Sequence, residues 1–179
     1  MRRYAIVIAG LALALLTGGC GGNGGEVESS APANITVTSS AFAEGESIPQ
    51  EYSCRGRNVS PPLSWSGIPA SAQALALVVD DPDAPRGTFT HWVAVDFAPT
   101  VTSLGQGEIP SGAVQANNSA GNPGYTGPCP PSGTHHYRFT VYALSERTGL
   151  TDGADLAEAQ RTIAEHAIVQ GTLTGTFAA

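Results

Sequence analysis

The chain has 179 residues, with 15 acidic residues against eight arginines and no lysine, so its formal net charge is −7. Two of the arginines lie in the first three residues, and removal of that end would leave a net charge of about −9. Such a body is a poor match for nucleic acid or for an anionic membrane surface, and we expect no nucleic-acid partner. The length allows one domain with a sizeable core, and 22 glycines and 13 prolines favour a β-rich fold with long loops over a helical bundle.

The N-terminus, residues 1–19, has the pattern of an export signal peptide. Arg2 and Arg3 form a basic start, Ala5 to Leu16 is an apolar run, and small residues precede Cys20. The apolar run is too short to span a bilayer. Cys20 resembles the lipidated cysteine of bacterial lipoproteins, so we expect an exported protein that is anchored in the cell membrane through a lipid. The alternative is cleavage and secretion without lipidation.

Residues 20–34 combine this cysteine with Gly-Gly pairs, serines and prolines, and they have little apolar content. A composition of this kind predicts a flexible tether. We therefore place a single domain at residues 35–179. It opens with a short strand at Ile35 to Thr38, and a loop from Ser53 to Trp65 leads into the next strand.

Three runs of alternating residues predict strands at Leu75 to Asp81, Phe89 to Phe97 and His135 to Ala143. In each run, one face is apolar except for a few polar side chains near a strand end. Those side chains belong to Asp81, His91, His135 and Tyr137. We expect this carboxylate, the two imidazoles and the phenol to converge on one site.

The second of these strands should bury one face only. That face comprises Phe89, His91, Val93, Val95 and Phe97, and the opposite face comprises Thr90, Trp92, Ala94 and Asp96. The assignment requires a regular strand, because a β-bulge would shift the alternation.

The remainder of the chain is mostly loop. Residues 98–134 are rich in Gly, Pro, Ser and Asn, with one apolar break at Ala113 to Ala116, and a loop of this length in a compact domain is often functional. Asp155 to His166 has apolar residues at helical spacing and predicts one amphipathic helix. Ile168 to Phe177 alternates again and predicts the last strand.

Two cysteines remain after Cys20, namely Cys54 and Cys129. Both lie in loops, and thiols tend to be oxidised in exported proteins. A disulfide between them is favoured, and the alternative is a pair of free thiols.

Four short motifs follow one another in this sequence: DPDAP at 81–85, THW at 90–92, GPCPPSG at 127–133 and HHY at 135–137. In this order and spacing they resemble the phosphatidylethanolamine-binding protein family, in its bacterial branch often called Raf-kinase-inhibitor-like. The resemblance runs from about Ile35 to Phe177. It departs from the family at His136, where arginine is common, and in the Pro-Cys pair of the loop.

The resemblance implies a mainly β fold, a sandwich of two packed antiparallel sheets, here with one short helix in the C-terminal region and long loops. It also implies a small anion-binding pocket at one end of the strands. Carried over by motif, the pocket would be lined by Asp81, Pro85, His91, Gly127, Cys129, Pro131, His135 and Tyr137. Imidazoles, a phenol and turned backbone N–H groups suit a phosphate-type ligand, and Asp81 would accept a hydrogen bond from His91 or from a ligand amine.

The expected function is therefore binding of a small anion, a phosphate ester or a phospholipid head group, with a regulatory or inhibitory role, and not catalysis. We expect no metal and no cofactor. One alternative is a hydrolase with Ser132 or Ser119 as nucleophile, or a metal-dependent enzyme using the same pocket, although no nucleophile elbow and no metal-ligand spacing is present. Another is a module that inhibits a protease or a kinase, since relatives are linked to such inhibition.

Overall fold

The computed structural model of the chain describes residues 26–179. The expected signal peptide, residues 1–19, and the expected lipidation site, Cys20, lie outside the described residues. Within the described part, no helix is long and apolar enough to cross a membrane.

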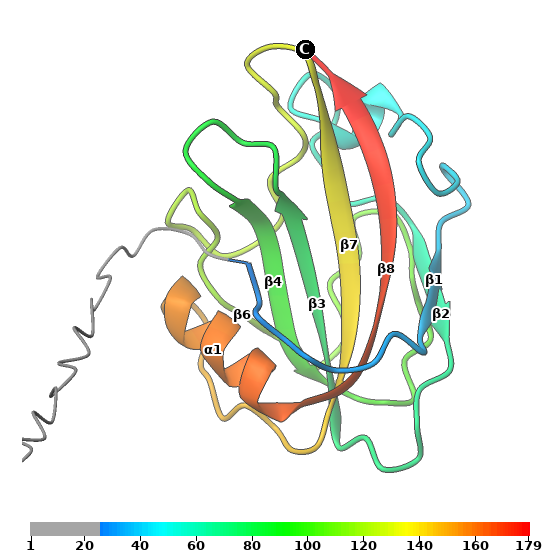
Figure 1. The fold of residues 1–179 in the computed structure, drawn as a ribbon, viewed down its shortest axis with the longest axis vertical. Coiled ribbons are helices and arrows are strands. Elements are labelled where there is room, and N and C mark those ends of the chain that lie inside the picture. The colour runs from blue at the N-terminus through cyan, green and yellow to red at the C-terminus, as the bar shows by residue number, and fades with distance from the viewer. Residues whose placement is uncertain (1–25) are drawn as a thin grey trace, which may run out of the picture.

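Two antiparallel sheets form the body of the molecule, as the sequence predicts (Figure 1). The larger sheet has the order β6-β4-β3-β7-β8, and its strands are β3 (Ala74–Asp81), β4 (Phe89–Phe97), β6 (Val114–Gln115), β7 (Thr134–Leu144) and β8 (Ala167–Ala178). The smaller sheet has the order β1-β2-β5, with β1 (Thr36–Thr38), β2 (Leu63–Ser66) and β5 (Ser103–Leu104). A 3-10 turn, η1 (Gln50–Tyr52), and one helix, α1 (Leu156–His166), complete the described elements.

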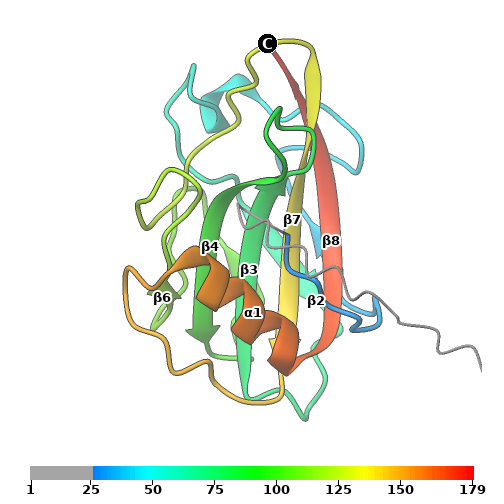
Figure 2. The ribbon, with the colours of Figure 1, turned by 60° about the vertical axis from the view of Figure 1, so that its left-hand side comes forward.

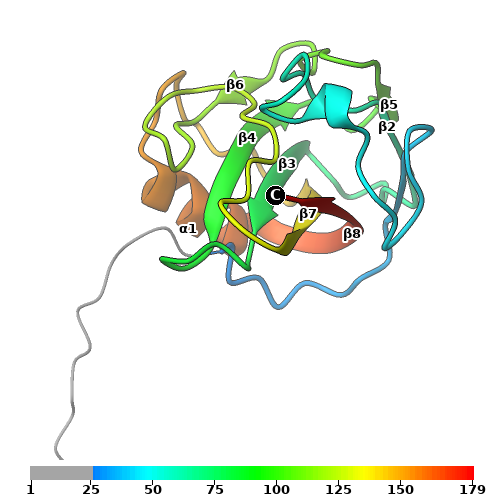
Figure 3. The same ribbon diagram turned by 90° about the horizontal axis from the view of Figure 1, so that it is seen from above.

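The larger sheet is covered on both faces. Seen from above, the smaller sheet lies on one side of it and α1 on the other (Figure 3). The main core fills the space between the two sheets and includes Leu75, Leu77, Val79, Phe139 and Trp65. A second core lies between the sheet and α1 and includes Ala76, Val78, Ala159 and Ile163. The alternation along β3 thus serves two cores, which explains why every residue of that strand is buried.

Helix α1 begins at Leu156, one residue after the predicted start, and Asp155 is its N-cap. The Asp155 carboxylate accepts hydrogen bonds from the backbone N–H groups of Ala157 (2.9 Å) and Glu158 (3.1 Å). These two donors have no partner inside the helix, and a capping carboxylate satisfies them. Figure 2 shows α1 lying across the outer face of β3 and β4.

The alternation predicted for β4 is wrong beyond its first residues, because the strand contains two β-bulges. The first extra residue is His91: Trp92 pairs with Val79 and Thr90 pairs with Asp80, which leaves His91 without a cross-strand partner. An extra residue reverses the facing of the strand that follows it.

The reversal is visible in the packing. Trp92 and Ala94 face the core between the sheets, whereas Val93 and Val95 face α1. His91 still points toward the end of the core between the sheets, where its ring contacts that of Tyr137. His91 thus points inward as predicted, although the regular alternation on which that prediction rested is interrupted at this residue.

The second bulge returns Phe97 to the inter-sheet core. It lies between the pairs Leu77 with Ala94 and Leu75 with Phe97, and it contains Asp96, whose φ of 64° is in the left-handed region. This backbone conformation is uncommon for a residue with a side chain. The Asp96 carboxylate supports it by accepting hydrogen bonds from the 148–149 turn, at distances of 2.7 to 3.2 Å.

The segment before β1 follows the outer face of the larger sheet. Glu26 forms an ion pair with Arg138 of β7, and Arg138 also donates two hydrogen bonds to the buried carboxylate of Asp80, at 2.7 and 2.8 Å. Further along, the backbone N–H of Gln170 donates to the carbonyl of Pro32 (3.0 Å). The sequence predicts a flexible tether up to residue 34, and the structure instead holds residues 26–34 against the sheet.

Candidate functional site

The ends of β3, β4 and β7 meet at the upper edge of the larger sheet in Figure 1, and a cavity of about 160 Å³ lies there. It is closed by the loop after β3 and by the Gly/Pro-rich loop before β7. The residues that line it are Asp81, Ala84, Pro85, Phe89, His91, Thr126, Gly127, Cys129, Pro130, Pro131 and His135.

Every site residue expected from the sequence lines this cavity except Tyr137, which is fully buried next to it. The sequence reasoning missed Ala84, Phe89, Thr126 and Pro130. Ala84 and Pro130 lie inside two of the motifs but were not selected from them, and Phe89 and Thr126 each lie one residue before a motif. The two serine candidates for a nucleophile, Ser119 and Ser132, do not line the cavity.

Asp81 and His135 form a buried pair in the wall of the cavity. The His135 Nδ1 lies 2.7 Å from Asp81 Oδ2, and the two side chains are only 9% and 5% exposed. Because a carboxylate can only accept, Nδ1 carries the proton and donates it. The other oxygen, Oδ1, accepts from the backbone N–H of Asp83 (2.8 Å). The sequence argument expected Asp81 to accept from His91 or a ligand amine, and in the structure it accepts from His135.

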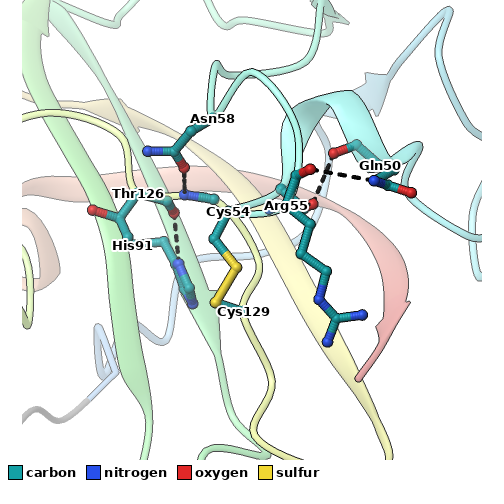
Figure 4. The surroundings of a disulfide bond; sticks show 9 residues. Gln50, Cys54, Arg55, Asn58, His91, Thr126 and Cys129 are labelled. Carbon is teal, nitrogen blue, oxygen red and sulfur yellow. Dashed lines mark hydrogen bonds between the residues drawn. A yellow bond between two sulfur atoms is a disulfide. The ribbon is translucent and has the colours of Figure 1, made fainter.

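His91 is fixed in a comparable way by the backbone. Its Nδ1 lies 2.6 Å from the carbonyl oxygen of Thr126 and donates to it (Figure 4). Burial lowers the pKa of His91, although the Thr126 carbonyl and the Asp81 carboxylate oppose that shift. At neutral pH the ring is therefore neutral, and its free nitrogen, Nε2, carries a lone pair.

Tyr137 lies between the two histidines. Its ring packs edge-on against His91, at a centroid distance of 5.3 Å, and stacks with His135 at 6.5 Å. Its hydroxyl is buried, and within the described chain no group forms a hydrogen bond of good geometry with it, although the Asp81 carboxylate and the backbone N–H of Cys129 lie close by. Burial raises the pKa of Tyr137, the Asp81 carboxylate adds to the rise, and the backbone amide of Cys129 opposes it. The hydroxyl thus remains a protonated donor close to two residues that line the cavity.

The loop that forms the far wall is held by its neighbours. The Gly127 N–H donates to the side-chain oxygen of Asn58 (2.8 Å), and the Thr126 N–H donates to the carbonyl of His91 (2.9 Å). Gly127 is required at its position, because a Cβ there would lie 2.5 Å from the Tyr52 carbonyl oxygen. Only glycine lets the loop approach η1 this closely.

A disulfide ties the same loop to the segment after η1. Cys54 and Cys129 are bonded, with their Cα atoms 5.5 Å apart and a sequence separation of 75, which confirms the predicted bridge (Figure 4). The Cys54 N–H also donates to the carbonyl of Pro128 (3.1 Å). Both cysteines are exposed, so the bridge forms part of the cavity's outer wall and not of the core.

The second histidine of the HHY motif lies outside the cavity. His136 points to the opposite face of β7, where its Nδ1 lies 2.7 Å from Asp83 Oδ2. The His136 side chain and backbone N–H both hydrogen-bond this carboxylate and lower the pKa of Asp83. Over residues 26–179, no group of three or more His, Cys, Asp or Glu residues is arranged to hold a metal ion.

The sequence model of the phosphatidylethanolamine-binding protein family matches residues 38–178. The chain belongs to the phosphatidylethanolamine-binding protein family. The match covers the two sheets except the first two residues of β1, and it includes every residue that lines the cavity, so the resemblance inferred from the four motifs is confirmed.

Among individual members of the PEBP family, the chain is 44% identical to a Mycobacterium tuberculosis protein named as the candidate lipoprotein LppC, over 99% of this chain and 97% of that protein. It is 41% identical to a UPF0098 protein of Methanothermobacter thermautotrophicus, over 80% of this chain and 98% of the relative. The crystal structure of a candidate PEBP homologue, CT736 of Chlamydia trachomatis, superposes with a TM-score of 0.77 at 38% identity, covering 82% of this chain and 99% of that one. E. coli YbcL, described as a new member of the mammalian PEBP family, gives a TM-score of 0.77 at 33% identity with the same coverage.

Proposed function

We propose that the chain is a binding protein whose cavity takes a small anion, either a phosphate ester or the head group of a phospholipid. Occupancy of the cavity serves a regulatory or inhibitory role, and turnover of the ligand is not part of it. Membership in the PEBP family supports a ligand-binding role in general. The finer assignment to an anion rests on the donors that surround the cavity.

The observation that carries the proposal is the Tyr137 hydroxyl, which is buried without a partner. Buried polar groups in folded proteins are nearly always hydrogen-bonded, and an exception calls for an explanation. A ligand oxygen in the adjoining cavity would supply the missing acceptor. The Nε2 atoms of His91 and His135 add two further donors when these rings are protonated.

The size of the cavity limits what can enter. A buried cavity of about 150 Å³ is large enough for a molecule such as benzene. The present cavity, at about 160 Å³, is thus suited to a phosphoryl group with a short substituent. If the ligand is a phospholipid, only its head group is held here and its acyl chains lie outside.

The test is a titration with sodium sulfate, inorganic phosphate and glycerophosphoethanolamine, followed by amide chemical shifts in NMR. We expect shifts at His91, Gly127 and Cys129. Removal of a hydrogen bond to a charged group costs about 1.5 to 3 kcal/mol, so His91→Ala and His135→Ala should each raise the Kd about tenfold or more. The matched control is His136→Ala, which removes the neighbouring imidazole outside the cavity and should leave the Kd unchanged.

Unchanged affinity in His91→Ala and His135→Ala, in protein that remains folded, would place the anion elsewhere. Shifts with glycerophosphoethanolamine but not with inorganic phosphate would identify a lipid head group as the ligand class. The reverse pattern would identify a soluble phosphate ester.

We further propose that the protein is exported and held at the cell membrane by a lipid on Cys20. The relative named as a candidate lipoprotein aligns over 99% of this chain, including its N-terminal region. The apolar run before Cys20 and the cysteine itself support the same assignment. A diacylglycerol-modified cysteine supplies two acyl chains, which is what stable anchoring needs.

A further inference from the structure

In both histidines at the cavity, the ring nitrogen Nδ1 is hydrogen-bonded to another group of the protein. His135 donates from Nδ1 to the Asp81 carboxylate, and His91 donates from Nδ1 to the Thr126 carbonyl. In the neutral form of each ring, Nε2 therefore carries the lone pair. His135 lines the cavity, so Nε2 is the nitrogen that it has left for a bound ligand.

The surroundings of His135 favour nucleophilic attack by that nitrogen. A carboxylate behind an imidazole fixes its tautomer and orientation and raises the basicity of the opposite nitrogen. The ring is held from a second side by Tyr137, which stacks on it at an interplanar angle of 22°. Histidine is an established covalent nucleophile when a base or a carboxylate orients it.

The charge balance of the cavity also fits an incoming phosphoryl group. The described residues that line the cavity include no arginine or lysine, and the one carboxylate among them, that of Asp81, accepts a hydrogen bond from His135. Positive character toward a bound phosphoryl group would come from His91 after proton uptake, with the Tyr137 hydroxyl as a neutral donor.

We propose that His135 is a phosphoryl acceptor, modified at Nε2 by a small acyl phosphate that enters the cavity. The inference rests on the proposed function, because it requires that the cavity takes phosphoryl groups. The Nε2 lone pair forms the N–P bond while the P–O bond to the acyl group breaks, and its electron pair leaves with the carboxylate. The Nδ1 proton remains on the ring against Asp81, so no further reactant is required. The product is a single modification of the binding protein and not a turnover cycle.

The chain contains its own control in the next residue. His136 has the same Nδ1 to carboxylate distance, 2.7 Å, to Asp83. Its side chain is 56% exposed and lies on the other face of β7, away from the cavity. Non-specific chemistry at histidine would therefore favour His136, whereas chemistry in the cavity would favour His135.

The experiment is incubation of the purified protein with acetyl phosphate, followed by intact mass, phosphorus NMR and fragment mapping under alkaline conditions. We expect one acid-labile, alkali-stable phosphoryl group on His135 and none on His136. Modification at His136 alone, or no modification at all, would overturn the inference. A parallel titration with inorganic phosphate separates the two proposals: binding without modification overturns only this inference, and absence of binding overturns the proposed function as well.

Two variants sharpen the test. Asp81→Asn keeps an acceptor for Nδ1 but removes the charge. At metal-bound histidines, loss of such a partner typically lowers activity by about tenfold to 100-fold. We expect the modification rate to fall by at least that factor of about ten, while the affinity for inorganic phosphate rises, because a negative charge has left the cavity. Asp83→Asn, the matched change at the exposed pair, should leave the modification rate unaltered. Equal rates in wild type and Asp81→Asn would contradict the role assigned to the Asp81 pair.

Discussion

If the cavity binds an anion as proposed, His91 should make that binding dependent on pH. Its ring is neutral near neutral pH because burial lowers its pKa, and the groups that face it are Asp81 on β3 and His135 and Tyr137 on β7. An anion stabilises the protonated ring, so binding takes up a proton. A group with a lowered pKa stays neutral to lower pH in the free protein, and affinity should therefore increase as the pH falls.

Sulfate is the appropriate probe for this effect, because its own charge does not change in the range concerned. We expect the Kd for sulfate to fall as the pH is lowered from about 8 to 6. Because binding takes up at most one proton, the fall is at most about tenfold for each pH unit. The dependence should be largely lost in His91→Asn. Calorimetry in buffers of different ionisation enthalpy measures the proton uptake directly, and an uptake of zero would contradict this role for His91.

The loop before β7 is the element that closes the cavity, and the disulfide holds it. In the chain-entropy model, a bridge across about 75 residues stabilises the fold by about 4 kcal/mol. The double variant Cys54→Ser, Cys129→Ser should lower the melting temperature by roughly 10 °C. It should also raise the Kd for phosphate severalfold, because loop order would have to form on binding.

Reducing agent supplies the control for that prediction. It should reproduce both effects in the wild-type protein and have neither effect in the double variant. A lower melting temperature with unchanged affinity would mean that the hydrogen bonds with Asn58, His91 and the backbone of residue 54 hold the loop in place without the bridge.

Elements whose pattern follows the period of the strand or helix could be predicted from the sequence. The predicted bounds of β3, β4, β7, α1 and β8 agree with the structure within one residue, because apolar alternation marks the strands and apolar residues at helical spacing mark the helix. The bulges at His91 and Asp96 could not be predicted, because they depend on cross-strand pairing and on hydrogen bonds from the distant 148–149 turn. The docking of Glu26 on Arg138 was missed for the same reason, since a polar segment carries no local sign of its partner.

The site was predictable in a different sense. The four motifs named most of the residues that line the cavity, but they did not show how those residues are paired. His135 of β7 pairs with Asp81 of β3, and His91 of β4 pairs with the carbonyl of Thr126 in the loop before β7, so each pairing joins segments that are far apart in sequence. Pairings of this kind are properties of the assembled sheet and not of any one strand.

At the scale of the whole molecule, anchoring is open to a direct test. Cys20→Ala should move the protein from the membrane fraction to the soluble exported fraction, because no lipid can then be attached. Mass spectrometry of the wild-type N-terminus should show a modified Cys20. An unmodified cysteine, or cleavage at another position, would contradict the lipoprotein assignment.

The ion pair between Glu26 and Arg138 acquires a further meaning if Cys20 carries a lipid. Cys20 and Glu26 are six residues apart, and a chain of that length reaches at most about 20 Å. If the whole 26–31 segment were released, including Val27, which packs against the second core, the first fixed point would be Pro32, where Gln170 holds the backbone, and the reach would extend to roughly 40 Å. If Cys20 is lipidated, the ion pair of Arg138 with Glu26 would thus limit the distance between the bilayer and the domain that carries the cavity.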